Sequence, residues 1–88
     1  SYFSNFTQAV GKVKFINKKP KQLTVDLPID YYGQAETIGI TQYVTEQAEK
    51  YFDNIDEYEI RIKDGNTPRA LISKSKDDKE PQVHIYHN

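Results

Sequence analysis

The chain has no cysteine, no methionine and no tryptophan among its 88 residues. The absence of cysteine excludes disulfide bonds, thiol catalysis and cysteine-based metal sites. No segment approaches the roughly 18 apolar residues that a membrane-spanning helix needs. No basic segment followed by an apolar one opens the chain, so no signal peptide is visible, although a cleaved one would leave no trace. We therefore expect one small cytoplasmic domain over residues 1–88.

Residues suited to catalysis are few. The two histidines, His84 and His87, lie three positions apart in a predicted strand, where alternation puts them on opposite faces and separates them as metal ligands. The sequence has neither a glycine-rich phosphate-binding motif nor a nucleophile elbow. Carboxylates cluster where we expect solvated surface, at Asp53, Asp56, Glu57 and Glu59. These observations predict a non-enzymatic protein without a metal or cofactor.

Alternating apolar and polar residues predict five strands. The clearest alternation is at 57–63, where Tyr58, Ile60 and Ile62 should face inward. The other predicted strands span residues 12–17, 21–29, 69–74 and 82–87. Pro20 is expected to break the chain between the first two strands, and Pro28 to end the second or mark it as an edge.

One segment changes to the helical period. An apolar stripe predicts an amphipathic helix over 40–53, with Thr37 or Thr41 as its cap. The stripe contains Ile40, Val44, Ala48, Tyr51, Phe52 and Ile55, with Tyr43 beside it. Phe3, Phe6 and Val10 have helical spacing, so the N-terminal segment is either a short helix at 4–10 or an extended arm.

The predicted order of elements is (α)ββαβββ. One apolar face per strand is typical of half-buried antiparallel strands, and one amphipathic helix can cover that face. We therefore predict an α+β domain with a five-stranded, mainly antiparallel sheet and one helix packed on it. The expected core includes Leu23, Val25, Val44, Phe52, Ile60 and Ile85.

Charge is unevenly distributed along the chain. Residues 1–25 carry five lysines and no acid, residues 26–60 carry one lysine and nine acids, and residues 61–88 carry six basic and four acidic residues. The basic hairpin has two interpretations: phosphate contacts with an aromatic that stacks on a base, or lysines that protect a sheet edge from aggregation. Its candidate nucleic-acid-binding residues are Lys12, Lys14, Phe15, Lys18, Lys19 and Lys21.

Tyrosines and arginines indicate a binding surface of another kind. Tyr31 and Tyr32 are adjacent in a predicted loop, and tyrosine is favoured at protein interfaces. The candidate partner-binding residues are Tyr31, Tyr32, Tyr86, Arg61 and Arg69. We therefore predict a small regulatory module that docks on a protein as an adaptor, subunit or inhibitor, of the kind that phages and other mobile elements encode. Nucleic-acid binding is the alternative, self-association stays open, and no membrane partner is expected.

Overall fold

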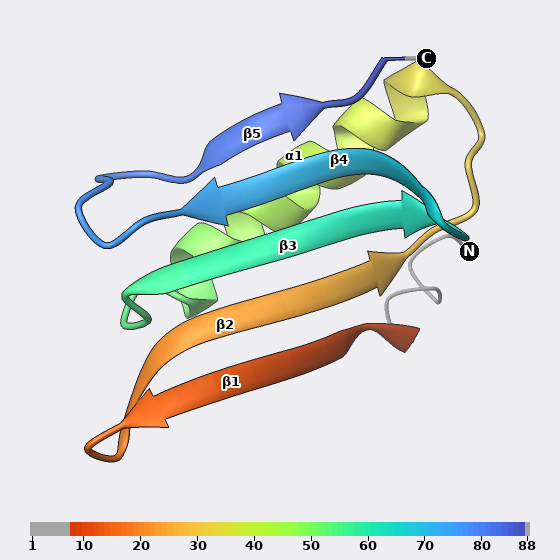
Figure 1. Cartoon of the computed structure of the whole chain (residues 1–88). Helices are drawn as coiled ribbons and strands as arrows, with labels where there is room; N and C mark the ends of the chain where they lie inside the picture. Colours follow the sequence, from red (N-terminus) through yellow and green to blue (C-terminus); the bar gives the residue numbers. More distant parts are fainter. Residues whose placement is uncertain (1–7, 88) are drawn as a thin grey trace.

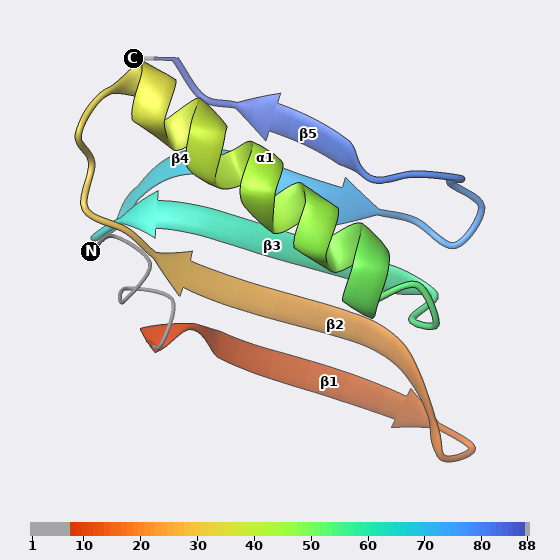
Figure 2. The same cartoon turned by 180° about the vertical axis from the view of Figure 1, so that it is seen from behind.

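The computed structural model describes residues 8–87 and shows one α-helix beside a five-stranded sheet (Figures 1 and 2). In chain order the elements are β1 (Val10–Ile16), β2 (Lys19–Pro28), α1 (Gln34–Tyr51), β3 (Glu57–Asp64), β4 (Thr67–Lys74) and β5 (Gln82–Ile85). The predicted α+β class, the five strands and the helix across the sheet are confirmed. The predicted helix 4–10 falls mostly outside the described residues, and its last residue, Val10, belongs to β1.

The strands lie in the order β1-β2-β3-β4-β5. Three of the four neighbouring pairs are antiparallel, and β2 and β3 are parallel. Parallel neighbours need a long crossover, and α1 forms it by leading the chain back between β2 and β3. The sheet is therefore mixed, and mainly antiparallel as predicted.

A two-residue turn closes the β1–β2 hairpin. Asn17 and Lys18 have φ angles of 53° and 66°. Positive φ at both central residues is typical of a type I′ turn, whose twist matches that of the flanking strands. The expected break at Pro20 was wrong, since Pro20 lies within β2 opposite Phe15, beside an irregularity in the ladder. An irregular position tolerates a residue that cannot donate a hydrogen bond.

The helix begins six residues earlier than predicted, at Gln34 instead of residue 40. Thr37 and Thr41 are buried in its first turns and are not caps. Their hydroxyls donate to carbonyls four residues earlier, Thr37 Oγ1 to Gly33 O at 3.0 Å and Thr41 Oγ1 to Thr37 O at 2.7 Å. Because the core-facing positions of these turns hold threonine, the apolar period does not reveal them.

The core lies between α1 and the sheet. Its buried apolar side chains are Leu23, Leu27, Ile29, Ile40, Ala48, Tyr58, Ile60, Ile62, Ala70 and Ile72. Two of the six predicted core residues, Leu23 and Ile60, are buried. The other four are partly buried and pack against this cluster: Val25, Val44, Phe52 and Ile85. The predicted inner face of β3 is therefore correct.

The helix covers the sheet unevenly. Figure 2 shows α1 crossing β3 and β4, with β1 well outside its footprint. Ile62 on β3 and Ile72 on β4 are 0% exposed, whereas all seven residues of β1 are exposed. We call β3 and β4 the covered half of the sheet, and β1 and β2 the open half, with Leu23 and Leu27 of β2 buried where the two halves meet.

Candidate functional site

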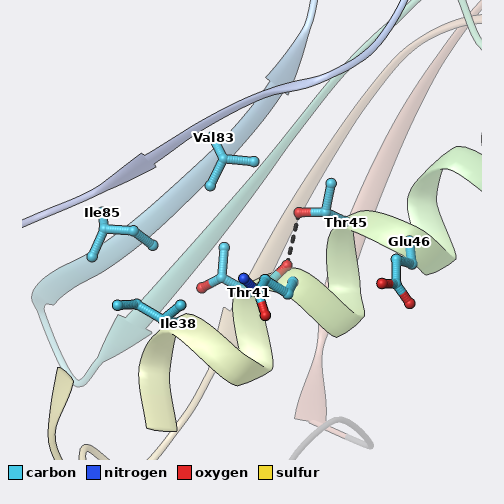
Figure 3. A pocket seen from close by; sticks show the side chains of 7 residues that line it. Ile38, Thr41, Thr45, Glu46, Val83 and Ile85 are labelled. Atoms are coloured by element: carbon cyan, nitrogen blue, oxygen red, sulfur yellow. Dashed lines mark hydrogen bonds between the residues drawn. The ribbon is translucent and has the colours of Figure 1, made fainter. Parts of the chain in front are cut away.

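A hollow of about 610 Å³ lies between α1 and β5, and we call it the β5 groove (Figure 3). It is open to solvent, since Ile38 and Val83 on its two sides are exposed. Its lining residues are Ile38, Thr41, Gln42, Thr45, Glu46, Val83 and Ile85. Glu46 is the one ionisable side chain in this lining, so the groove lacks a second titratable group for paired acid–base chemistry.

The threonine hydroxyls of the β5 groove are already engaged. Thr45 Oγ1 donates to Thr41 O at 2.7 Å, as Figure 3 shows, and Thr41 Oγ1 donates in turn to Thr37 O. These bonds satisfy polar groups that would be costly to bury alone. A ligand in this groove would find hydroxyl acceptors there but no free hydroxyl proton.

A second hollow, of about 420 Å³, lies on the other side of α1, and we call it the β2 groove. Its lining residues are Ala9, Val25, Leu27, Tyr43, Val44, Gln47, Ala48, Tyr51, Phe52 and Ile60. The two tyrosines are its only ionisable residues, so the groove is suited to apolar contact rather than to proton transfer. The sequence placed Tyr51 on the buried stripe, and this was wrong because the residue is 63% exposed. The spacing of Tyr43, Gln47 and Tyr51, four residues apart, is the signal that marks this wall of the groove.

The structure brings three predicted partner-binding residues together. The Arg69 guanidinium lies 3.6 Å from the centre of the Tyr31 ring, and Tyr86 N donates to Arg69 O at 3.1 Å. Tyr32 extends away from the fold and is 67% exposed. Tyr31 is therefore engaged within the domain, and Tyr32 is the exposed member of the pair.

Arg61 lies on the neighbouring strand β3, opposite Leu71, and is held there by ion pairs. Its guanidinium is 2.8 Å from Glu59 Oε2 and 3.8 Å from Asp26 Oδ1, and Lys63 Nζ lies 3.6 Å from the same Asp26 oxygen. These residues lie on the sheet face away from α1, since their neighbours Ile60 and Ile62 point into the core. That face therefore carries largely neutralised charge around Arg61.

The lysine hairpin does not form one surface for a phosphate backbone. Lys12 and Lys14 alternate with Val13 and Phe15, so the aromatic ring and these two lysines point to opposite faces of β1. Lys18 lies in the turn, and Lys19 begins β2. Lys21 Nζ is bound to Asp56 Oδ2 at 3.1 Å.

The histidines and carboxylates are also dispersed. His84 packs edge-on against the Tyr86 ring at 4.6 Å, and His87 Nδ1 lies 3.2 Å from Gln34 Nε2. Between residues 8 and 87, no group of three potential metal-ligating side chains occurs. The predicted acidic cluster divides among separate partners: Asp56 binds Lys21, Glu57 accepts a bond from Gln22, and Glu59 pairs with Arg61.

Two shifted pKa values follow from packing and pairing. The hydrogen bond from Lys21 lowers the pKa of Asp56. Burial raises the pKa of Tyr58, and the nearby charges of Glu49 and Asp53 add to this. Neither residue lines the β2 or the β5 groove. In the part of the chain that the structure describes, no helix has the length and apolarity to cross a membrane, and the cytoplasmic location stays a prediction.

Known proteins resemble the chain in sequence and fold. Residues 1–80 match the model of the family described as CamS sex pheromone cAM373 precursor. The C-terminal domain of the sex pheromone staph-cAM373 precursor from Staphylococcus aureus is 82% identical, with a TM-score of 0.90 over 99% of this chain and 27% of that one. No curated protein matches the chain.

Two further solved structures share the fold. The sex pheromone precursor from Lactobacillus salivarius subsp. salivarius UCC118 is 17% identical, with a TM-score of 0.79 over 99% of this chain and 29% of that one. Another structure, the sex pheromone staph-cAM373 precursor, is 21% identical, with a TM-score of 0.77 over 97% of this chain and 34% of that one. The chain thus spans between about a quarter and a third of the length of these proteins.

The family match corrects the function predicted from sequence. A match over residues 1–80 and 82% identity to a pheromone precursor contradict the interpretation as an adaptor, an inhibitor or a phage-encoded module. The same findings contradict nucleic-acid binding, and the divided lysine hairpin gives the physical reason. Composition alone misled because a small polar domain without motifs fits many functions. The chain belongs to the CamS sex pheromone cAM373 precursor family.

Proposed function

We propose that this chain is a non-catalytic folded domain of a sex pheromone precursor. The observation that carries the proposal is the 82% identity, over 99% of this chain, with a domain of the staphylococcal precursor. Since the match covers only 27% of that protein, the role proposed is that of one part of a longer polypeptide.

The chemistry of both grooves supports a non-catalytic role. Catalytic sites bring together titratable groups with shifted pKa values in a cleft. Here the β5 groove contains one carboxylate, Glu46, and the β2 groove contains none. Asp56 and Tyr58, whose pKa values are shifted, lie outside both grooves. The two grooves beside α1 therefore offer surfaces for packing rather than a set of reacting groups.

Gene deletion and complementation in the host test both parts of the proposal. Deleting the precursor gene should remove from the culture medium the activity that elicits a mating response. Complementation with the wild-type gene, or with Glu46→Gln or His84→Gln, should restore that activity equally. Full activity after deletion would contradict a precursor role. Failure of a normally folded variant to complement would contradict the non-catalytic role.

A further inference from the structure

An apolar surface extends from the β2 groove across the inner face of β1. Val13 pairs with Leu23 in the ladder and shares its face, and alternation puts Phe15 on the same face. Phe15 is 61% exposed and Val13 is 44% exposed. Across the groove, Tyr43 and Tyr51 of α1 are exposed as well. These four side chains, together with the β2 groove that α1 and β2 line, make up what we call the open apolar surface.

The two faces of β1 differ in chemistry. Lys12 and Lys14 point away from the groove, and Val13 and Phe15 point toward it. A strand with this pattern normally buries its apolar face and solvates its charged one. Gly11, opposite Val25, adds no side chain to the apolar face, and a Cβ there would lie 3.7 Å from Leu23 Cδ1 and 3.9 Å from Val25 Cγ2. Contiguous exposed apolar surface of this kind marks an interface.

Length decides between two occupants of this surface, a second copy of the chain and another part of the same polypeptide. In three related structures this chain matches only 27%, 29% and 34% of the polypeptide, so most of each protein lies outside the matched region and can supply the second kind of occupant.

We propose that the open apolar surface is an internal interface, covered by an apolar segment from another part of the same precursor polypeptide. This inference rests on the proposed function, since it requires that the chain be one domain of a longer precursor. It also explains why β1 is an exposed strand with well-ordered alternation: its apolar face packs against another part of the precursor.

Cysteine labelling of the full precursor tests this interface. The 88 residues contain no cysteine, so a single introduced thiol reports on one position in them. Phe15→Cys probes the apolar face of β1, and Lys14→Cys, one residue earlier on the lysine face, is the matched control. Both positions are exposed in the domain. Maleimide labelling, followed by peptide mass spectrometry, gives the reaction rate at each site.

We expect Phe15→Cys to react at least about tenfold more slowly than Lys14→Cys in the full precursor, because packing limits access to the thiol. A second pair on α1, Tyr51→Cys and Lys50→Cys, should behave in the same way and guards against disruption of the interface by the first substitution. Equal rates within both pairs would overturn the proposal. Protection that disappears on dilution would also overturn it, by identifying a second copy as the occupant. Neither result would alter the deletion experiment, which tests the precursor role separately.

Discussion

The covered and open halves of the sheet have similar sequence patterns and different environments. On β3, Tyr58, Ile60 and Ile62 alternate with charged residues and are buried beneath α1. On β1, Val13 and Phe15 alternate with lysines in the same way and remain exposed. Alternation therefore identifies which face of a strand is apolar, and the position of the helix decides which apolar face is buried.

The chain connection explains where the helix lies. Because α1 joins β2 to the parallel strand β3, it must cross the sheet on the side toward β3. β1 precedes this crossover and pairs only with β2 along the outer edge. The open half therefore lies outside the helix footprint as a consequence of topology.

Truncation of one apolar residue in each half should give the largest contrast. Ile62→Ala should lower the free energy of unfolding by about 2–5 kcal/mol, because Ile62 is fully buried and its removal leaves a cavity. Val13→Ala in the 88-residue chain should cost less than about 1 kcal/mol, since Val13 is exposed there. Urea denaturation measures both. Equal losses would show that the open half is packed as tightly as the covered half.

The elements that were predictable from sequence are those whose pattern is local. The alternation at Tyr58–Ile62 and the stripe through Ile40 and Val44 identified β3, most of α1 and the side of each that is buried. The early start of α1 was not predictable because Thr37 and Thr41 occupy core-facing positions, where the helical pattern requires apolar residues. Their hydroxyls can be buried there because they donate to backbone carbonyls four residues earlier. The parallel β2–β3 pairing is non-local, and no residue in either strand specifies it.

The function was less accessible to the same reasoning. Three of the predicted partner-binding residues, Tyr31, Arg69 and Tyr86, lie together through contacts that no local pattern specifies. The open apolar surface joins Phe15 on β1 to Tyr51 on α1, which are 36 positions apart in sequence. No motif that the sequence analysis identified points to the CamS family, so comparison with relatives was needed to show membership of it.

Two glycine substitutions in the crossover between the halves, one before α1 and one within it, should have opposite effects on the stability of the chain. Gly33, before α1, has a φ of 115°, a conformation that side chains disfavour, although a Cβ added there would meet no atom within 4 Å. Gly33→Ala should therefore destabilise the chain by about 1–3 kcal/mol through backbone strain alone. Gly39 is helical and equally unobstructed, so Gly39→Ala should stabilise it by about 0.5–1 kcal/mol. Thermal unfolding tests the pair, and destabilisation by both would contradict a purely conformational cause.

The contact of Tyr31 with Arg69 links the loop after β2 to β4 and so bridges the two halves. Tyr31→Leu keeps an apolar side chain but removes the aromatic face beneath the guanidinium. We expect a loss of about 0.5–1 kcal/mol in urea denaturation, typical of a cation–π contact near the surface. Tyr32→Leu is the matched control, and its exposed side chain should leave stability nearly unchanged. A larger loss for Tyr32→Leu would show that the adjacent tyrosines have been assigned in reverse.

The smallest expected effect concerns the Lys21–Asp56 ion pair, which joins β2 to the segment before β3. Lys21 lowers the pKa of Asp56 below its ordinary value of 3.8. The pair therefore contributes its full stabilisation at pH values above 3.8, and this contribution is lost as the pH falls through the lowered pKa of Asp56 in the folded state.

Lys21→Gln should flatten the decline in stability on acidification below about pH 5. Lys76→Gln removes an equal charge that acts on Asp56 only at a distance, so it should flatten the decline less. Urea denaturation across this acidic range compares the three proteins, and identical curves for the two variants would mean that the hydrogen bond adds nothing beyond charge.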